Sequence, residues 1–512
     1  MNIVLFMVDQ LSAKWLEGGS ALACPTPNLD RLRRAGTTFT NAYASNPVCC
    51  AARATLATGL TSRGHGVLQN GYRLNPELPT VMHSLQAAGW QTGAFGKLHF
   101  EPHYSGFDVD FRKYGFDVVY NTEDPRGGAW LDWVEREHPE HYGAALATAW
   151  PTSIPAFAAY GAKKTDLASR IRRIRKEFKW GTADFPRGTA QYYVLPFPEE
   201  LSQTSWISGH ALNFLAEADR DRPIFAHVSY VQPHAPSCPP AAYVDRIDRS
   251  AIPRPVLPEW QDDPLAPHCF TPNGLHIDPV AWRDRRHLYL ADVAHLDHQL
   301  GLLLDALEAS GQWNETVLFF LSDHGDLLYD HGFFGKGERH YDACIRIPLV
   351  VAGKGVRQGQ ECRALVQHED VVPTVLELAG LPQPQVPVGG PHTLDVADPS
   401  LPGRSLLPWC RGEEPAGWRD AVYVESYNNI DSRTPLNWAR TVRTEEWRYT
   451  LYPGGAGEQL FHMGDDVDEA RNLAGESGHA ETRRALRDRL LEELILQDFP
   501  HPPRDLIALG VH

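Results

Sequence analysis

Short apolar runs of strand length, each followed by polar or ionisable residues, constrain the fold of this 512-residue chain most strongly. The runs are continuous rather than alternating, which is typical of strands buried on both faces of a sheet. Segments with helical spacing separate them, and this alternation predicts an α/β fold with a large, mostly parallel sheet between helices. The expected strands are residues 3–8, 92–95, 224–231, 316–321 and 348–352.

Three segments predict helices that would pack on this sheet. In the first, Thr26-Pro27 suits an N-cap and a first helical position, and Gly36 suits a stop. Residues 287–310 carry leucines at helical spacing, and residues 373–379 are closed by a glycine. The alternation of strand and helix therefore continues to about residue 380.

The chain changes character after residue 380. Residues 381–402 are rich in proline and glycine, which predicts a linker or long loop. Residues 403–512 hold short strand candidates and a charged terminal helix, so we expect a smaller C-terminal α+β domain with an antiparallel sheet. Its strands are expected at 421–427, 439–443 and 447–452, and its helix at 481–497.

Composition excludes several classes of function. The net charge of −16 argues against general binding to nucleic acid or anionic membranes, and any site for an anionic substrate must be locally positive. No apolar run approaches the roughly 18 residues of a transmembrane helix, and the first residues lack a basic, cleavable leader. The eight cysteines are scattered without CxxC pairs, as expected of free thiols. We expect a cytoplasmic protein without a membrane partner.

The stretch from Cys49 to Gly59 predicts a short helix with a functional N-terminus. Residues 51–58 are good or tolerable helix formers, and Gly59 is a natural stop. Cys49 would then lie where free backbone N–H groups and the helix dipole favour an anion, with Arg53 one turn further on. A nucleophile there would face a sulfate or phosphate. The alternative is a buried structural cysteine, the commonest role of a free thiol.

Polar side chains follow four of the expected strands at the point where each strand ends. Ligands of open α/β sheets bind beyond the carboxyl ends of strands, so these side chains should meet at one edge of the sheet. Carboxylates suit Ca²⁺, Mg²⁺ or Mn²⁺ and an imidazole favours Mn²⁺, while lysines would neutralise developing charge and histidines would transfer protons. The residues are Asp9 and Gln10, Lys97 and His99, His234, and Asp323 and His324.

The same residues resemble the motifs of the type I sulfatases, in the alkaline phosphatase superfamily. Cys49-Cys50-Ala51-Ala52-Arg53 is similar to the sulfatase signature of Cys or Ser, any residue, Pro or Ala, any residue, and Arg. Residues 25–30, 96–100, 322–326 and 331–337 resemble further motifs of that family. In that family a formylglycine-generating enzyme oxidises the cysteine to formylglycine, whose hydrated aldehyde is the nucleophile.

The resemblance implies an alkaline phosphatase-like fold, with residues 1–380 as the catalytic domain, and a role for each motif residue. The implied ligands of one divalent metal ion are Asp9, Gln10, Asp323, His324 and the modified Cys49. The implied sulfate-binding residues are Arg53, Lys97 and Lys336. His234 would protonate the leaving group, and His99 would help to release sulfate from formylglycine. Gln10 and His324 resemble the branch with choline sulfatase and the phosphonate monoester hydrolases, which leaves both Mn²⁺ and Ca²⁺ open.

We predict hydrolysis of aryl or alkyl sulfate monoesters. The second hypothesis is a phosphonate monoester hydrolase or phosphodiesterase with the same nucleophile. Asn70, expected to bind substrate, resembles that second group, whereas Lys97 and His99 resemble the sulfatases; promiscuity between the two esters is expected. The third hypothesis is a protein that binds sulfated ligands through an unconverted Cys49, without turnover.

The remaining expectations concern the pocket and the assembly. The Trp- and Tyr-rich segment 103–201 and the loop around His268 and Cys269 are expected to shape the substrate pocket. The basic run 170–176 is expected to be a solvated helix face. The expected ligand is a small sulfate ester, and the charged C-terminal helix leaves room for a homo-oligomer.

Overall fold

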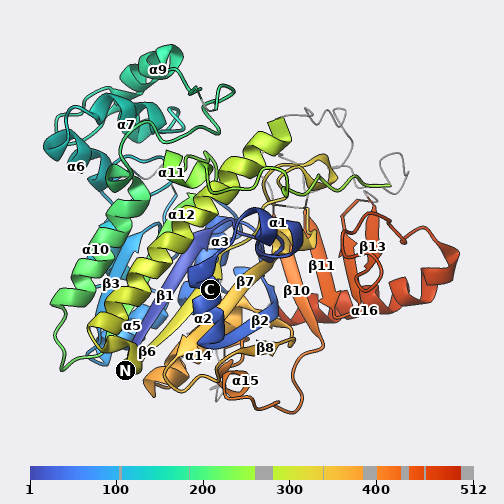
Figure 1. Ribbon diagram of the computed structural model, residues 1–512. Helices are drawn as coiled ribbons and strands as arrows, with labels where there is room; N and C mark the ends of the chain where they lie inside the picture. Colours follow the sequence, from blue (N-terminus) through green and yellow to red (C-terminus); the bar gives the residue numbers. More distant parts are fainter. Residues whose placement is uncertain are drawn as a thin grey trace, which may run out of the picture.

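The computed structural model describes residues 1–102, 106–183, 185–259, 281–337, 339–384, 401–427, 438–454 and 457–497. Within them, nine strands form one mixed sheet and four form a separate antiparallel sheet (Figure 1). The order across the large sheet is β4 (Val118–Asn121), β3 (Gln91–Gly96), β5 (Ile224–Pro233), β1 (Asn2–Asp9), β6 (Thr316–Ser322), β7 (Arg346–Gly353), β2 (Gly36–Tyr43) and β8 (Gln360–Cys362), with β9 (Val366–Gln367) beside β2.

The centre of the large sheet is parallel, as predicted. Strands β4, β3, β5, β1 and β6 run in the same direction, so their carboxyl ends lie at one edge. The four predicted strands that end in polar residues are neighbours within this block. Strand β7 runs antiparallel to both β6 and β2, a reversal that its apolar run does not reveal, because such a run reports burial and not direction.

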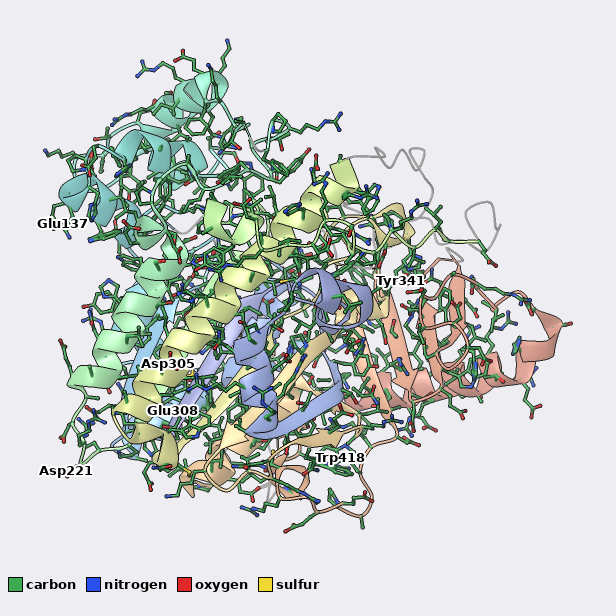
Figure 2. All side chains as sticks on the ribbon, viewed as in Figure 1. Glu137, Asp221, Asp305, Glu308, Tyr341 and Trp418 are labelled. Atoms are coloured by element: carbon green, nitrogen blue, oxygen red, sulfur yellow. The ribbon has the colours of Figure 1, made fainter. Side chains whose placement is uncertain are left out.

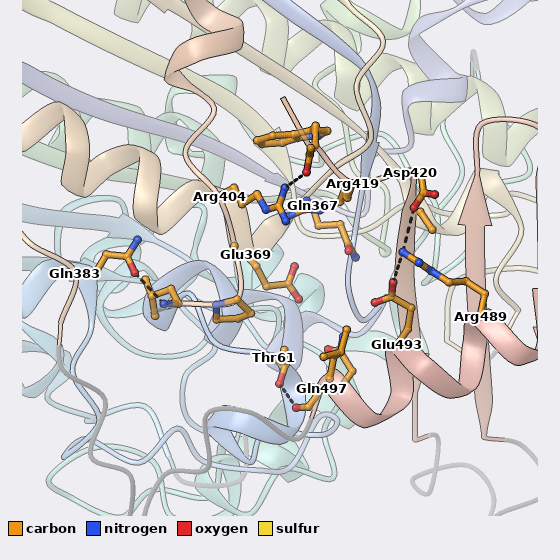
Figure 3. A pocket seen from close by; sticks show the side chains of 17 residues that line it. Thr61, Gln367, Glu369, Gln383, Arg404, Arg419, Asp420, Arg489, Glu493 and Gln497 are labelled. Carbon is orange, nitrogen blue, oxygen red and sulfur yellow. Dashed lines mark hydrogen bonds and ion pairs between the residues drawn. The ribbon is translucent and has the colours of Figure 1, made fainter. Parts of the chain in front are cut away.

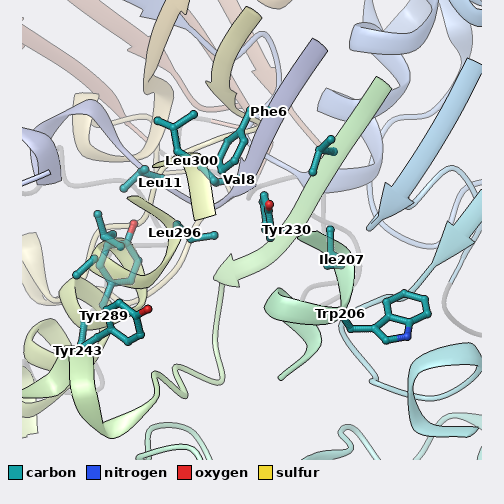
Figure 4. Packing of buried hydrophobic residues seen from close by; sticks show 14 of the residues in the cluster. Phe6, Val8, Leu11, Trp206, Ile207, Tyr230, Tyr243, Tyr289, Leu296 and Leu300 are labelled. Carbon is teal, nitrogen blue, oxygen red and sulfur yellow. The ribbon is translucent and has the colours of Figure 1, made fainter. Parts of the chain in front are cut away.

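Helices cover both faces of the large sheet (Figure 1). One core lies under α2 (Pro27–Arg34), α10 (Gln203–Glu217) and α12 (Ala281–Ala309), and the other under α3 (Cys49–Thr58), α5 (Val81–Ala87), α14 (Val371–Ala379) and α15 (Leu407–Cys410). In the first core, Phe6 and Val8 of β1 share a buried cluster with Leu296 and Leu300 of α12 (Figure 4). Leu5 belongs to the second core, so alternate side chains of β1 fill both.

Within the Trp- and Tyr-rich segment 103–201, four short helices lie beyond one end of the sheet (Figure 1). These are α6 (Ala129–Glu137), α7 (Tyr142–Thr148), α8 (Pro155–Ala158) and α9 (Leu167–Glu177). On α9, Ile171 is buried while Arg172 and Arg173 are exposed, which confirms that the basic run is a solvated helix face. Further short helices are α1 (Gly18–Ala23), α4 (Ser62–His65), α11 (Ala241–Val244) and α13 (Asp342–Ile345). Across the described ranges, no helix combines the length and apolar character needed to cross a bilayer.

The second sheet has the order β10 (Ala421–Ser426), β11 (Ala439–Thr444), β12 (Trp447–Leu451) and β13 (Glu458–His462). Helix α16 (Ala480–Leu496) packs on it through Leu486 and Leu490. Three of these strands and the helix match the sequence prediction, whereas β13 was not predicted. The domain limits at residues 380 and 402 stay a prediction, and residues 385–400 lie outside the described residues.

Tyr341 joins the two sheets. Figure 2 labels its position beside the small sheet. Its ring stacks on that of His331 with centroids 3.7 Å apart, and it also contacts Phe461 of β13. Gln459 of the same strand donates a hydrogen bond to the Tyr341 hydroxyl at 3.1 Å. The segment that follows β6 is therefore packed against the small sheet, which fixes one side of the region beyond the strand ends.

Gly36 has a different role from the one predicted. Helix α2 ends at Arg34, and Gly36 begins β2, where an added Cβ would lie 2.2 Å from the Val351 carbonyl oxygen of β7. We expect Gly36→Ala to lower the free energy of unfolding by about 1–3 kcal/mol or more, because the two strands must separate. Thermal unfolding measures the effect. Gly143→Ala is the matched control, since an added Cβ there meets nothing within 4 Å; equal melting temperatures for the two variants would contradict the prediction.

Candidate active site

The ends of β3, β5, β1 and β6 lie level with one another. Val8 of β1 pairs with Ser322 of β6, and Met7 of β1 and Gly96 of β3 both pair with Ser229 of β5. The residues that follow these strands therefore emerge side by side. They are the predicted site residues: Asp9 and Gln10, Lys97 and His99, His234, and Asp323 and His324.

Four of the predicted metal ligands form one buried cluster. One ligand atom each from Asp9, Cys49, Asp323 and His324 lies within 4.8 Å of the others. The Cys49 sulfur occupies the place that an oxygen of formylglycine would take. Two carboxylates and an imidazole in a buried site are a donor set that fits a divalent cation.

Gln10 lies at the same cluster, on strained backbone. Its φ is +68°, and its backbone N–H donates to Asp323 Oδ1 at 3.0 Å. The side-chain Nε2 donates to Asp326, while the buried Oε1 has no hydrogen-bond partner among the described residues. A buried amide oxygen without a hydrogen-bond donor reduces stability unless a cation binds it. Gln10 therefore also fits the predicted metal site.

Cys49 begins α3, as predicted. Gly59, at φ +74°, ends the helix in the left-handed conformation, and every residue between them is buried. The alanines of this helix allow close packing against the core beneath the sheet. At the N-terminus, Cys50 donates its backbone N–H to Asn70 Oδ1 at 3.1 Å. Asn70 therefore caps the helix that carries the candidate nucleophile, a contact that its predicted role in substrate binding did not include.

Lysine and histidine side chains surround the Cys49 sulfur. Lys336 Nζ donates a hydrogen bond to it, and His324 Nε2 lies 3.2 Å away. Burial alone would raise the pKa of the thiol, but Lys336, Lys97 and His324 outweigh burial and hold the pKa well below its usual value. The head of α3 is therefore a locally positive site within a chain of negative net charge, which suits an anionic substrate.

Arg53 holds the ligand carboxylates. Its guanidinium donates to Asp9 Oδ2 and to Asp323 Oδ2, each at 2.9 Å. Further donors reach the Lys97 carbonyl oxygen at 2.7 Å and Ser229 Oγ at 2.9 Å. These contacts hold both carboxylates in place. The implied contact between Arg53 and sulfate stays a prediction.

Lys97 and His99 are held by a turn that the sequence did not single out. Lys97 Nζ lies 2.6 Å from Asp9 Oδ2 and 2.6 Å from Asp124 Oδ1. His99, at φ +51°, donates its backbone N–H to Glu123 Oε1 at 3.0 Å. Asp124 and Glu123 follow β4, a short and mostly half-exposed strand without an apolar run, so no periodic signal marked them.

His234 lies on the accessible side of the cluster. His234, Asn70 and Lys336 are half-buried, while Cys49 is fully buried. Burial and the charge of Lys336 lower the pKa of His234, but Asp124, Asp9 and a hydrogen bond to Cys49 prevail and raise it. A histidine with a raised pKa that lies beside the accessible edge is suited to proton donation.

A separate cavity of about 930 Å³ lies between residues 401–421 and α16 (Figure 3). None of the predicted site residues lines it. Two of its arginines form ion pairs, Arg419 with Asp370 and Arg489 with Glu493 at 2.8 Å, and the third, Arg404, donates to the Gly417 carbonyl oxygen at 2.5 Å. Convergence of charged groups, and not cavity size, therefore locates the candidate site. The predicted pocket loop around His268 and Cys269 lies outside the described residues.

Comparisons with known proteins agree with this geometry. The family profile "Sulfatase" matches residues 1–381, and the profile "N-sulphoglucosamine sulphohydrolase, C-terminal" matches residues 329–495. An arylsulfatase of Clostridium perfringens is 27% identical over 96% of this chain and 94% of its own. A choline-sulfatase of Rhizobium meliloti is 26% identical over 92% and 82%. The crystal structure of a phosphonate monoester hydrolase of Agrobacterium radiobacter is similar with a TM-score of 0.74 and 25% identity, over 97% of this chain and 96% of that one.

Proposed function

The chain belongs to the sulfatase family of enzymes, and we propose that it hydrolyses aryl or alkyl sulfate monoesters through a formylglycine made from Cys49. The observation that supports this most is the position of Cys49. Its sulfur lies at the head of α3, in one cluster with Asp9, Asp323 and His324, and accepts a hydrogen bond from Lys336. A structural thiol would lie in apolar surroundings and not among these charges.

The donor set supports one divalent cation, Mn²⁺ or Ca²⁺, held by Asp9, Gln10, Asp323 and His324 with an oxygen of the modified Cys49. When bound, the cation would polarise the ester oxygens, and the hydrated aldehyde would supply the nucleophilic oxygen. Arg53 would keep the two carboxylates fixed and charged whether or not substrate is present.

The other side chains would bind the sulfate and move protons. Lys336 and Lys97 would stabilise the negative charge on the sulfate oxygens. His234 Nδ1 lies 2.6 Å from the Ala235 carbonyl oxygen, so Nδ1 carries a proton and Nε2 is the atom that would protonate the leaving oxygen. His99, anchored through Glu123, would accept a proton as sulfate is released.

A phosphonate monoester hydrolase with the same nucleophile is the second candidate. The similarity to the Agrobacterium radiobacter enzyme supports it, as does the contact of Asn70 at the head of α3. Lys97 and His99 support the sulfatase instead. In a sulfate monoester every group on sulfur is an oxygen that can accept a hydrogen bond or a proton, so two further ionisable side chains find partners there. A phosphonate has an organic group in place of one of those oxygens.

Rates on a matched pair of sulfate and phosphonate esters decide between the two candidate functions. We expect the Mn²⁺-loaded enzyme to prefer phenyl sulfate to a phenyl phosphonate ester by at least about tenfold in kcat/KM, or about 1.4 kcal/mol. Initial rates over a range of concentrations of both esters measure this. A large preference for the phosphonate would overturn the first proposal and support the second.

Three further parts of the proposal concern the cell and the assembly. A formylglycine-generating enzyme would act on Cys49 during maturation, and the protein would work in the cytoplasm. A homo-oligomer stays a prediction, and light scattering coupled to gel filtration tests it. If Cys49 is not converted in the native host, the alternative is a protein that binds sulfated ligands without turnover.

A further inference from the structure

One turn contacts both of the loops that carry the proposed acid–base residues. Residues 122–126 follow β4 and reach the loop after β3 through two carboxylates. Glu123 accepts the backbone N–H of His99 at 3.0 Å, and Asp124 accepts Lys97 Nζ at 2.6 Å. Arg126 completes the turn, with its backbone N–H donating to the Glu123 carbonyl oxygen at 2.9 Å. Its side chain points to the other loop.

Arg126 holds the segment that follows His234. Its Nη2 donates to the Pro236 carbonyl oxygen at 3.2 Å and to Cys238 Sγ at 3.1 Å. Its Nη1 donates to Tyr193 Oη at 2.8 Å, so a third contact fixes the guanidinium. Pro236 is two residues from His234, so displacement of this carbonyl would also displace the imidazole.

Arg126 occupies a position where an arginine reduces the stability of the fold. Its side chain is 2% exposed, and its φ of +62° is rare for a residue with a Cβ. The groups that act on its charge include Cys238, Tyr193 and the buried Asp292, but no carboxylate of the described residues lies close enough to form an ion pair with it. A buried charge without a direct ion pair and strained backbone both reduce stability, and they persist mainly where function requires them.

Arg126 does not have room to bind substrate itself. The cavity beside it, lined also by Gln203, Gln232 and Cys238, measures about 10 Å³. That is space for a single water molecule and not for an organic group or a sulfate. Both Nη atoms already donate to protein atoms. Any effect of Arg126 on the reaction must therefore pass through the segment that it holds.

We infer that Arg126 is a positioning residue that keeps His234 Nε2 at the leaving-group oxygen. It does so by tying residues 234–238 to the turn that also holds Lys97 and His99. The inference rests on the proposed function, because it assigns Arg126 to the step in which His234 protonates the leaving group. A residue that only stabilised the fold would affect all substrates alike.

The test compares two aryl sulfates with the Mn²⁺-loaded enzyme. For Arg126→Met, we expect kcat/KM to fall about a hundredfold for phenyl sulfate and less than about fivefold for 4-nitrophenyl sulfate, because a good leaving group needs little protonation. Arg126→Lys, which keeps the charge and one donor, should lose less on phenyl sulfate. In a His234→Ala background, Arg126→Met should add no further loss on phenyl sulfate.

Arg222→Met is the control, because the Arg222 side chain also donates to backbone carbonyl oxygen, here of Gly89 and Trp90, but at the opposite ends of the strands. It should leave both rates unchanged. Equal losses on the two esters for both Arg126 variants, or a full further loss in the His234→Ala background, would overturn the inference. A wild-type enzyme inactive on both sulfates would instead refute the proposed function, so the two failures are distinguishable.

Discussion

Replacing Cys49 by alanine should lower kcat/KM for an aryl sulfate by at least about a thousandfold, because the proposed nucleophile is made from this side chain. The fold should survive, since Cys49 is buried at the first position of α3, where alanine is well tolerated. Initial rates on 4-nitrophenyl sulfate measure the loss. The melting temperature shows whether the variant is folded.

Cys50→Ala is the matched control for Cys49→Ala. The two cysteines are adjacent and equally buried, but Cys50 packs into the apolar core under α3, where burial raises the pKa of its thiol well above the usual value. It should keep most of the activity. Full activity of Cys49→Ala would contradict a hydrolase mechanism that uses a nucleophile made from Cys49.

Peptide mass spectrometry across residues 49–53 tests the modification directly. We expect the aldehyde at Cys49 in protein from the native host, and an unchanged thiol at Cys50. Ala51 stands where most sulfatases carry proline, so this measurement also shows whether alanine supports the oxidation. An unmodified Cys49 in catalytically active protein would contradict the proposed nucleophile.

The sequence predicts the centre of the fold well because local patterns carry the needed information there. The strands β1, β3, β5 and β6 are continuous apolar runs, and the chemistry-bearing residues follow them directly. Strand β2 has no such run, since three threonines and an asparagine interrupt residues 36–43, which are only partly buried. Its pairing with β7 depends on a close approach at Gly36, which only the assembled sheet reveals.

The contacts that the sequence does not reveal act at long range. Lys336 reaches Cys49 because Asp326 accepts the backbone N–H groups of Leu328 and Gly335, each at 2.9 Å, and so folds the loop after β6 back on itself. The motif resemblance included Lys336, but nothing in its spacing indicated this contact. Asp124 and Arg126 follow a strand too short and exposed to be recognised. Their importance comes from contacts across the sheet.

Arg53 has partners within the protein that its place one turn into the helix does not predict. From the sequence, Arg53 lies near the head of α3 and would face the anion. In the structure it is 1% exposed, and the carboxylates of Asp9 and Asp323 take up its charge. A buried guanidinium must satisfy its donors, and two anionic neighbours do so whether or not substrate is bound; the contact with sulfate stays a prediction.

Asp323→Asn should remove most of the affinity for a divalent cation. Asp323 accepts three N–H groups: those of Gln10 and His324 on Oδ1, each at 3.0 Å, and Arg53 Nε on Oδ2 at 2.9 Å. An asparagine must place its NH₂ group against one of these donors and also loses the negative charge. We expect Mn²⁺ affinity to fall more than about a hundredfold, with a loss of about 3 kcal/mol or more in stability.

Calorimetric titration of the metal-free protein with Mn²⁺ measures the affinity, and thermal unfolding measures the stability. Asp297→Asn is the matched control, because Asp297 is also a buried carboxylate that accepts backbone N–H groups, those of Leu29 at 2.8 Å and Asn28 at 3.2 Å. It caps α2 away from the cluster, so its loss should lower the melting temperature without changing Mn²⁺ affinity. If Asp323→Asn bound Mn²⁺ as tightly as the wild type, the buried carboxylates would serve only to neutralise Arg53 and Lys97, and the metal site would have to lie elsewhere.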